Sequence, residues 1–182
     1  MTSYCALLRG IGPTNPNMRN EKLRGVLERL GFEGVASVIS SGNVVFSTDA
    51  QDAAALEDRI QAALRADLGI PGGTIVRSRA ELQELVDRAP FGDLPHSRET
   101  YLTVTFLKRP LDDPGTVPDP GFEGVRVIGY DAGARAILTV TDTTATGSPD
   151  YMVWLERTLG KDMTTRTWLT VNRILTRMTK TA

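Results

Sequence analysis

The sequence has few of the residues that metal centres and redox sites use. It contains one cysteine, Cys5, and one histidine, His96. A single cysteine cannot form an internal disulfide or a thiolate cluster, and a single histidine excludes a multi-histidine metal site. The carboxylates are scattered along the chain, so no acid–base pair can be assigned. We therefore expect neither a cofactor nor a metal, and we interpret Cys5, which lies inside an apolar run, as a core residue.

Long hydrophobic runs are also missing. The longest, such as Tyr101–Leu107, are far shorter than the roughly 18 residues that a helix crossing a bilayer needs. The N-terminus has no basic stretch followed by an apolar segment and a cleavage site, so we expect a cytoplasmic protein with no membrane partner. A length of 182 residues, a hydrophobic content of 41% and a net charge of −1 are typical of an ordinary globular protein.

The first half of the chain predicts strands and helices in the order βαββαβ. Apolar runs of strand length alternate there with segments whose apolar residues recur at helical spacing. These segments are a strand at 4–9, a helix ending at 31, a hairpin of strands at 35–39 and 44–47, a helix at 53–68 and a strand at 74–77. The order is the split βαβ plan, in which the sheet order is 4-1-3-2. We therefore predict an α+β protein whose residues 1–79 form a ferredoxin-like subdomain.

The second half, residues 80–182, predicts another α+β subdomain, related to the ferredoxin-like plan and packed against the first. Ser78-Arg79-Ala80-Glu81 has capping-box spacing and opens a helix. Three strands follow, at 101–107, 125–130 and 136–141, and a turn-rich segment at 110–120 is inserted after the first of them. Two helices are expected last, one from Ser148-Pro149 and one from 165–167, which gives the order αβββ(αα).

Two polar loops of the first half are expected at one edge of the sheet. Right-handed crossovers bring the end of the first strand beside the hairpin turn. The residues concerned are Arg9, Gly10 and Asn15 from the first loop and Ser41, Gly42 and Asn43 from the turn. A guanidinium group, hydroxyls, amides and the backbone N–H groups that begin a helix are the ingredients of an anion site. We expect a small phosphate- or carboxylate-bearing ligand here; alternatively, Gly, Pro and Asn serve only to turn the chain.

The last helix is expected to carry a basic face. Arg166, Arg173, Arg177 and Lys180 are spaced by 7, 4 and 3 positions, and residues 157–182 carry six basic side chains and one acidic side chain. Clustered Arg and Lys side chains attract the phosphate backbone, so a nucleic-acid-binding module is the second functional hypothesis. The simpler interpretation is a solvated helix face. An enzyme of unassigned reaction is the third hypothesis, and it would act through positioning and electrostatics.

Three segments resemble a known bacterial family. The segments YCALLRG at 4–10, ISSGNVVF at 39–46 and TRTW at 165–168 are similar to the family catalogued as domain of unknown function 1697. The resemblance spans nearly the whole chain and implies two intertwined ferredoxin-like subdomains, a cytoplasmic protein and no established activity. Arg166 and Trp168 match the family pattern, whereas Thr167 stands where Asn is usual. We therefore add Arg166 to the expected anion site.

Overall fold

The computed structural model describes residues 1–182 except for residue 41, residues 146–150 and residues 181–182. The described residues form two antiparallel four-stranded sheets and five α-helices, which confirms the predicted α+β class. The chain divides into two compact units, one made of Met1–Leu82 and the segment from Arg173 onward, the other of Gln83–Asn172. None of the helices formed by described residues has the length and apolarity that a bilayer crossing requires.

The sheet of the first unit has the strand order β2-β3-β1-β4, which is the predicted 4-1-3-2 order seen from the other edge. Its elements are β1 (Thr2–Leu8), the 3-10 turn η1 (Pro16–Met18), α1 (Asn20–Arg29), β2 (Glu33–Ser37), β3 (Asn43–Thr48), α2 (Ala53–Leu68) and β4 (Thr74–Ser78). Helix α2 has the predicted bounds because its ends are strongly marked. Asp52 accepts hydrogen bonds from two amides of the first turn, Ala54 N and Ala55 N, and Gly69 ends the helix at φ +66°.

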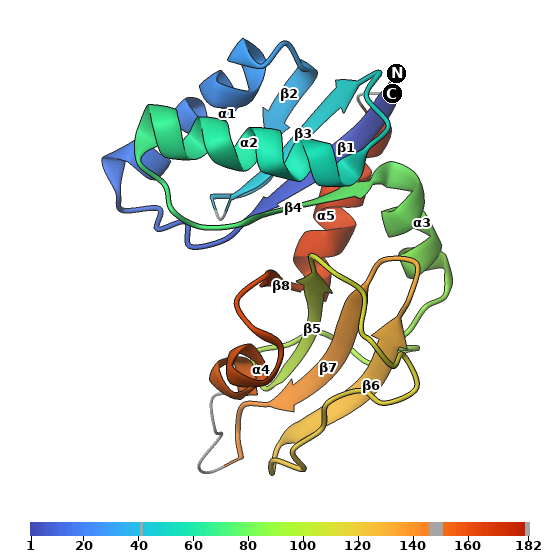
Figure 1. The fold of residues 1–182 in the computed structure, drawn as a ribbon. Helices are drawn as coiled ribbons and strands as arrows, with labels where there is room; N and C mark the ends of the chain where they lie inside the picture. Colours follow the sequence, from blue (N-terminus) through green and yellow to red (C-terminus); the bar gives the residue numbers. More distant parts are fainter. Residues whose placement is uncertain (41, 146–150, 181–182) are drawn as a thin grey trace. The chain divides into compact units, whose positions relative to one another are not determined.

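Helices α1 and α2 pack on one face of this sheet (Figure 1). Tyr4 and Leu8 of β1 point into that core with Leu23 of α1 and Ile60 of α2, all of them buried. Alternate residues of β1 point to the opposite face. Cys5 lies on that opposite face and is fully buried, as predicted for a core residue. Strand β1 is therefore buried on both sides.

The edge strand β4 carries a buried ion pair. Arg77 is 0% exposed and Glu57 of α2 is 2% exposed, and their Nη1 and Oε1 atoms are 3.7 Å apart. The same Glu57 oxygen accepts a hydrogen bond of 2.9 Å from Val76 N, a backbone group that an edge strand would otherwise leave unpaired. A single carboxylate thus balances a buried guanidinium charge and accepts a hydrogen bond from an outward-facing amide of the strand.

Replacing Glu57 by Gln should destabilise the protein strongly. The amide can still accept from Val76 N, but it no longer balances the buried charge of Arg77, and breaking a buried pair costs about 3–5 kcal/mol. Urea denaturation measures the change, with Glu28→Gln on the exposed face of α1 as the matched control, expected within about 0.5 kcal/mol of wild type. Equal stabilities for the two variants would contradict this account of the pair.

The second sheet has the strand order β6-β7-β5-β8. Its strands are β5 (Thr100–Leu107), β6 (Val125–Asp131), β7 (Ala136–Asp142) and β8 (Met163–Thr167), and the remaining helices of the chain are α3 (Arg79–Asp87), α4 (Tyr151–Leu159) and α5 (Trp168–Lys180). The predicted capping box is present at the start of α3, where Glu81 Oε2 accepts from Ser78 N at 2.7 Å and Ser78 Oγ accepts from Glu81 N at 3.2 Å. The predicted start of the fourth helix, Ser148-Pro149, lies outside the described residues.

Strand β8 corrects the prediction for the end of the chain. Residues 165–167 were expected to begin the last helix, but they belong to a strand that pairs with β5, and helix α5 begins at Trp168. The segment is rich in β-branched threonine, which favours a strand once a partner is available. Thr167 then marks the boundary, since its Oγ1 accepts a hydrogen bond from Thr170 N. The order of the second half is therefore αβββαβα.

Tyr151 of α4 is buried in the core of the second unit, beside Leu155 and Ile137. Its hydroxyl donates to the carbonyl oxygen of Pro118 at 3.3 Å. Burial, with a smaller contribution from the negative charge of Asp119, raises the pKa of Tyr151 to about 12. The unfolded chain, with an ordinary tyrosine pKa of about 10, therefore loses this proton first as the pH rises.

Tyr151 should make stability fall at alkaline pH. Its contribution is fully present below pH 10 and is lost as the pH rises towards 12, by about 1 kcal/mol between pH 9 and 11. Urea midpoints across this range should decline less in Tyr151→Phe than in wild type. The exposed Tyr101→Phe change is the control and should leave the slope as it is. The same decline in Tyr151→Phe and wild type would contradict the assignment. Some decline remains in both, because burial also raises the pKa of Tyr4.

Candidate functional site

The two predicted loops do meet at the end of β1. The amide of Leu8 donates a hydrogen bond of 2.8 Å to the carbonyl oxygen of Gly42, which ties β1 to the β2/β3 turn. Asn20, the first residue of α1, donates from Nδ2 to the carbonyl oxygen of Ile39 at 3.0 Å. The loop after β1, the start of α1 and the β2/β3 turn therefore form one corner of the first unit, which we call the β1 corner.

A third loop, between α2 and β4, completes the β1 corner. Arg9 N donates to the carbonyl oxygen of Gly73 at 2.9 Å. Gly72 packs so closely on Arg9 that a Cβ atom at position 72 would overlap the carbonyl oxygen of Arg9. A side chain is excluded here by close approach of two backbones, which is one of the uses that only glycine permits.

Two of the predicted ligand residues hold the backbone of the corner in place. Asn43 is fully buried, and its Nδ2 donates to the carbonyl oxygen of Val38 at 3.0 Å across the turn. Asn15 is exposed, and its Oδ1 accepts from Asn17 N at 2.9 Å, which caps η1. Both side chains therefore form hydrogen bonds that stabilise turns, which is the alternative role that the sequence left open. Ser41, the third polar side chain predicted there, lies outside the described residues.

The two glycines of the prediction differ in their surroundings. Both have a left-handed backbone, with φ +72° at Gly10 and +77° at Gly42. Gly42 is buried, and a Cβ there would lie 2.6 Å from Cγ1 of Ile11 and 3.0 Å from Cβ of Leu8. Gly10 is exposed, with open space where its side chain would be. Gly42 thus serves packing, while Gly10 leaves the backbone of the loop accessible.

Arg166 belongs to the second unit, whereas the residues of the β1 corner belong to the first. It lies on β8 of the second unit, opposite Val104, and it is 9% exposed. Its Nη1 donates to Thr164 Oγ1 at 2.7 Å and to the carbonyl oxygen of Thr165 at 2.9 Å. The expectation that it shares a helix face with the basic residues of α5 is wrong, because it precedes the helix. Three members of that face remain exposed on α5: Arg173, Arg177 and Lys180.

Three cations near the β1 corner were missed by the sequence analysis. Lys22 in the first turn of α1 donates from Nζ to Asn17 Oδ1 at 2.8 Å, so its ammonium group lies against the loop. Arg24 donates from Nη1 to Ser37 Oγ at 3.3 Å, at the end of β2. Arg19 is the residue before α1 and is exposed. The sequence could have indicated these cations, because all three lie within five residues of the start of α1.

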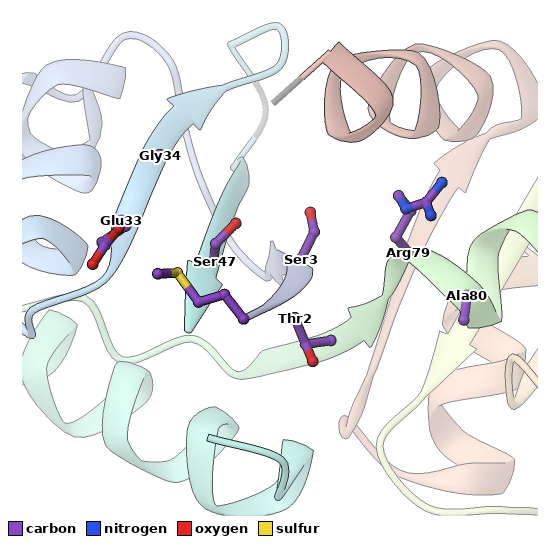
Figure 2. Close-up of a pocket in the computed structure, with 8 residues that line it drawn as sticks. Thr2, Ser3, Glu33, Gly34, Ser47, Arg79 and Ala80 are labelled. Carbon is purple, nitrogen blue, oxygen red and sulfur yellow. The ribbon is translucent and has the colours of Figure 1, made fainter. Parts of the chain in front are cut away.

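A pocket of about 710 Å³ lies at the opposite end of β1. Figure 2 shows its polar lining, in which Ser3 and Ser47 lie between Glu33 and Arg79. All of the lining residues belong to the first unit. The sequence analysis assigned no role to these residues, although serines at the ends of otherwise apolar strands were a visible signal.

Alanine at Gly72 should disturb the β1 corner, whereas alanine at the next residue should not. At Gly72 the new Cβ overlaps the Arg9 carbonyl, and such overpacking costs about 1–3 kcal/mol. At Gly73 the nearest atom is Gln61 Oε1, 4.0 Å from the new Cβ, so Gly73→Ala should stay within about 0.5 kcal/mol of wild type. Thermal unfolding of the two variants decides the matter, and a Gly72→Ala protein as stable as Gly73→Ala would refute the close approach.

The comparisons with known proteins bear on fold and family. The search of curated proteins gave no match. The solved structure of the conserved bacterial protein SP0830 from Streptococcus pneumoniae is similar with a TM-score of 0.71 and 22% sequence identity, over 97% of this chain and 98% of that one. At this identity the likeness shows a shared fold. The model of the family described as protein of unknown function, DUF1697, matches residues 1–118. The chain therefore belongs to the DUF1697 family, as its sequence segments predicted.

Proposed function

We propose that this protein binds a small phosphate- or carboxylate-bearing ligand at the β1 corner. The ligand lies against Arg9, Gly10 and Lys22, at the start of α1. Gly42 and Asn43 support this site by holding the turn beside it. The proposal takes the chain to be a cytoplasmic bacterial protein whose first unit is ferredoxin-like.

The charge distribution is the observation that carries this proposal. Residues 9–24 contain four basic side chains and one acidic side chain, and residues 34–48 contain no charged side chain at all. Hydrogen bonds bring these two segments together at the β1 corner. The four cations outnumber the single carboxylate, Glu21, and so produce a positive potential, which attracts and holds anions. The contact of Lys22 with Asn17 places one of these charges directly on the loop.

The backbone of the corner supports the same ligand class. Arg19 is the N-cap residue of α1, and among the described residues its side chain forms no hydrogen bond that caps the helix. The first amides of a helix that lack a cap are donors for an anion, and the helix dipole adds to the attraction. Gly10 leaves the approach to the adjacent backbone open. Backbone donors and mobile cationic side chains together are typical of phosphate sites.

Removing the cations of the corner should weaken anion binding. Inorganic pyrophosphate and succinate serve as probes of the phosphate and carboxylate classes, titrated into the labelled full chain at low salt and followed through the amide signals of Gly10 and Lys22. Arg9→Ala and Lys22→Ala should each weaken binding about tenfold, since each removes a charge-assisted hydrogen bond.

Arg173→Ala provides the matched control, because it removes one exposed arginine from α5 and leaves the corner unchanged. It should bind both probes as wild type does. Unchanged affinity in Arg9→Ala and Lys22→Ala would refute the site. Loss of affinity in Arg173→Ala, accompanied by salt-dependent retention on duplex DNA, would instead favour the nucleic-acid hypothesis for the basic face of α5.

A further inference from the structure

The pocket at the opposite end of β1 has a regular polar lining that the anion proposal does not use. Ser47 is the Cα partner of both Glu33 on β2 and Ser3 on β1. Tyr4 pairs with Ser78, so continuing the antiparallel register places Arg79 at the level of Ser3. Directly opposite residues in a sheet point to the same face. The register therefore sets a carboxylate on β2, hydroxyls on β3 and β1, and the guanidinium group of Arg79, the first residue of α3 directly after β4, in one row.

The two ends of this row carry opposite charges, the carboxylate of Glu33 and the guanidinium group of Arg79. In the part of the chain that the structure describes, neither Glu33 nor Arg79 forms an ion pair or a side-chain hydrogen bond. Both side chains are exposed to the pocket, and Ser3 and Ser47 between them are half-buried. Figure 2 shows the hydroxyls of both serines on the same side of the sheet as the guanidinium group of Arg79.

The Arg79 end is further suited to an anion. Arg79 and Ala80 form the first turn of α3, and both line the pocket. The carboxylate of Glu81 is turned back onto Ser78 N in the capping box. A carboxylate ligand at this end would therefore meet the guanidinium fork and the positive end of the helix together.

The span of the row limits what can bind. Three steps between neighbouring strands separate Glu33 from Arg79, which corresponds to about 14 Å between their Cα atoms. Both residues line the pocket, and their long side chains can span part of this distance. An extended tripeptide is about 10 Å long. The pocket volume of about 710 Å³ is also within the range that small ligands use.

We propose that this pocket binds a short peptide by its two termini. The α-carboxylate lies at Arg79 and the first turn of α3, the α-ammonium lies at Glu33, and the peptide groups lie over the hydroxyls of Ser3 and Ser47. A zwitterion with its charges at the two ends matches the row of donors and acceptors, whereas an anion alone leaves Glu33 facing it. This site stands independently of the β1 corner, because the two lie at opposite ends of β1.

Trialanine, its C-terminal amide and its N-acetyl form test the assignment of each end. Titration of each peptide into the labelled full chain is followed through the amide signals of Ser3, Ser47 and Ala80. Wild type should bind trialanine more tightly than either blocked form. Arg79→Gln should weaken trialanine about fivefold and remove the preference over the amide. Glu33→Gln should remove the preference over the N-acetyl form.

The controls are matched in charge and lie elsewhere on the first unit. Arg65→Gln on α2 and Glu28→Gln on α1 change the same charges at exposed positions and should bind all three peptides as wild type does. Arg9→Ala should also leave trialanine binding unchanged, which separates this result from that of the anion test. The proposal is overturned if trialanine gives no shifts at these amides, if blocking either terminus has no effect, or if Arg79→Gln and Glu33→Gln behave as the controls.

Discussion

The two-sided burial of β1 is the constraint on which the first unit depends. The strand pairs with β3 on one side and β4 on the other, and residues of both faces, such as Cys5 and Leu8, are buried. A slip of one residue in its pairing would exchange the two faces, so its register is strongly specified. That register sets Leu8 beside Gly42 at one end and Ser3 beside Ser47 at the other. Both proposed sites therefore take their geometry from the register of β1, and Ser3 of this strand lines one of them.

The asparagines of the β1 corner show why polar residues in turns are uncertain guides to function. A buried amide must first be hydrogen bonded, and the nearest donors and acceptors are those of its own turn. The buried Asn43 is satisfied by Val38 in this way, while the exposed Asn15 accepts from Asn17 N and caps η1. Exposed cations such as Lys22 do not need a hydrogen-bond partner within the protein. The charged side chains and the backbone, rather than the amides, are therefore the groups available to a ligand at this corner.

The sequence predicted well what local chemistry decides and poorly what distant pairing decides. Helix α2 has its predicted bounds, and the capping box of Ser78 and Glu81 is formed, because caps involve residues a few positions apart. Strand β8 has no alternation of apolar and polar residues from which a strand could be predicted. It forms a strand because it pairs with β5, which is far away in sequence. The same limit applies to the row from Glu33 to Arg79. Its members come from β2, β3, β1 and the start of α3, and only the combined register brings them together.

The two ends of the first sheet differ in a way that would keep their ligands apart. Residues around the β1 corner offer four cations against the single carboxylate of Glu21, so the ammonium group of a zwitterion placed there meets a positive potential. The pocket at the other end offers one guanidinium group and one carboxylate, so a compact dianion placed there gains Arg79 but faces repulsion from Glu33. Specificity of this kind depends on an unfavourable group as much as on a favourable one. Glu33 therefore has two roles, since it attracts an ammonium group and repels the anions that the β1 corner would bind.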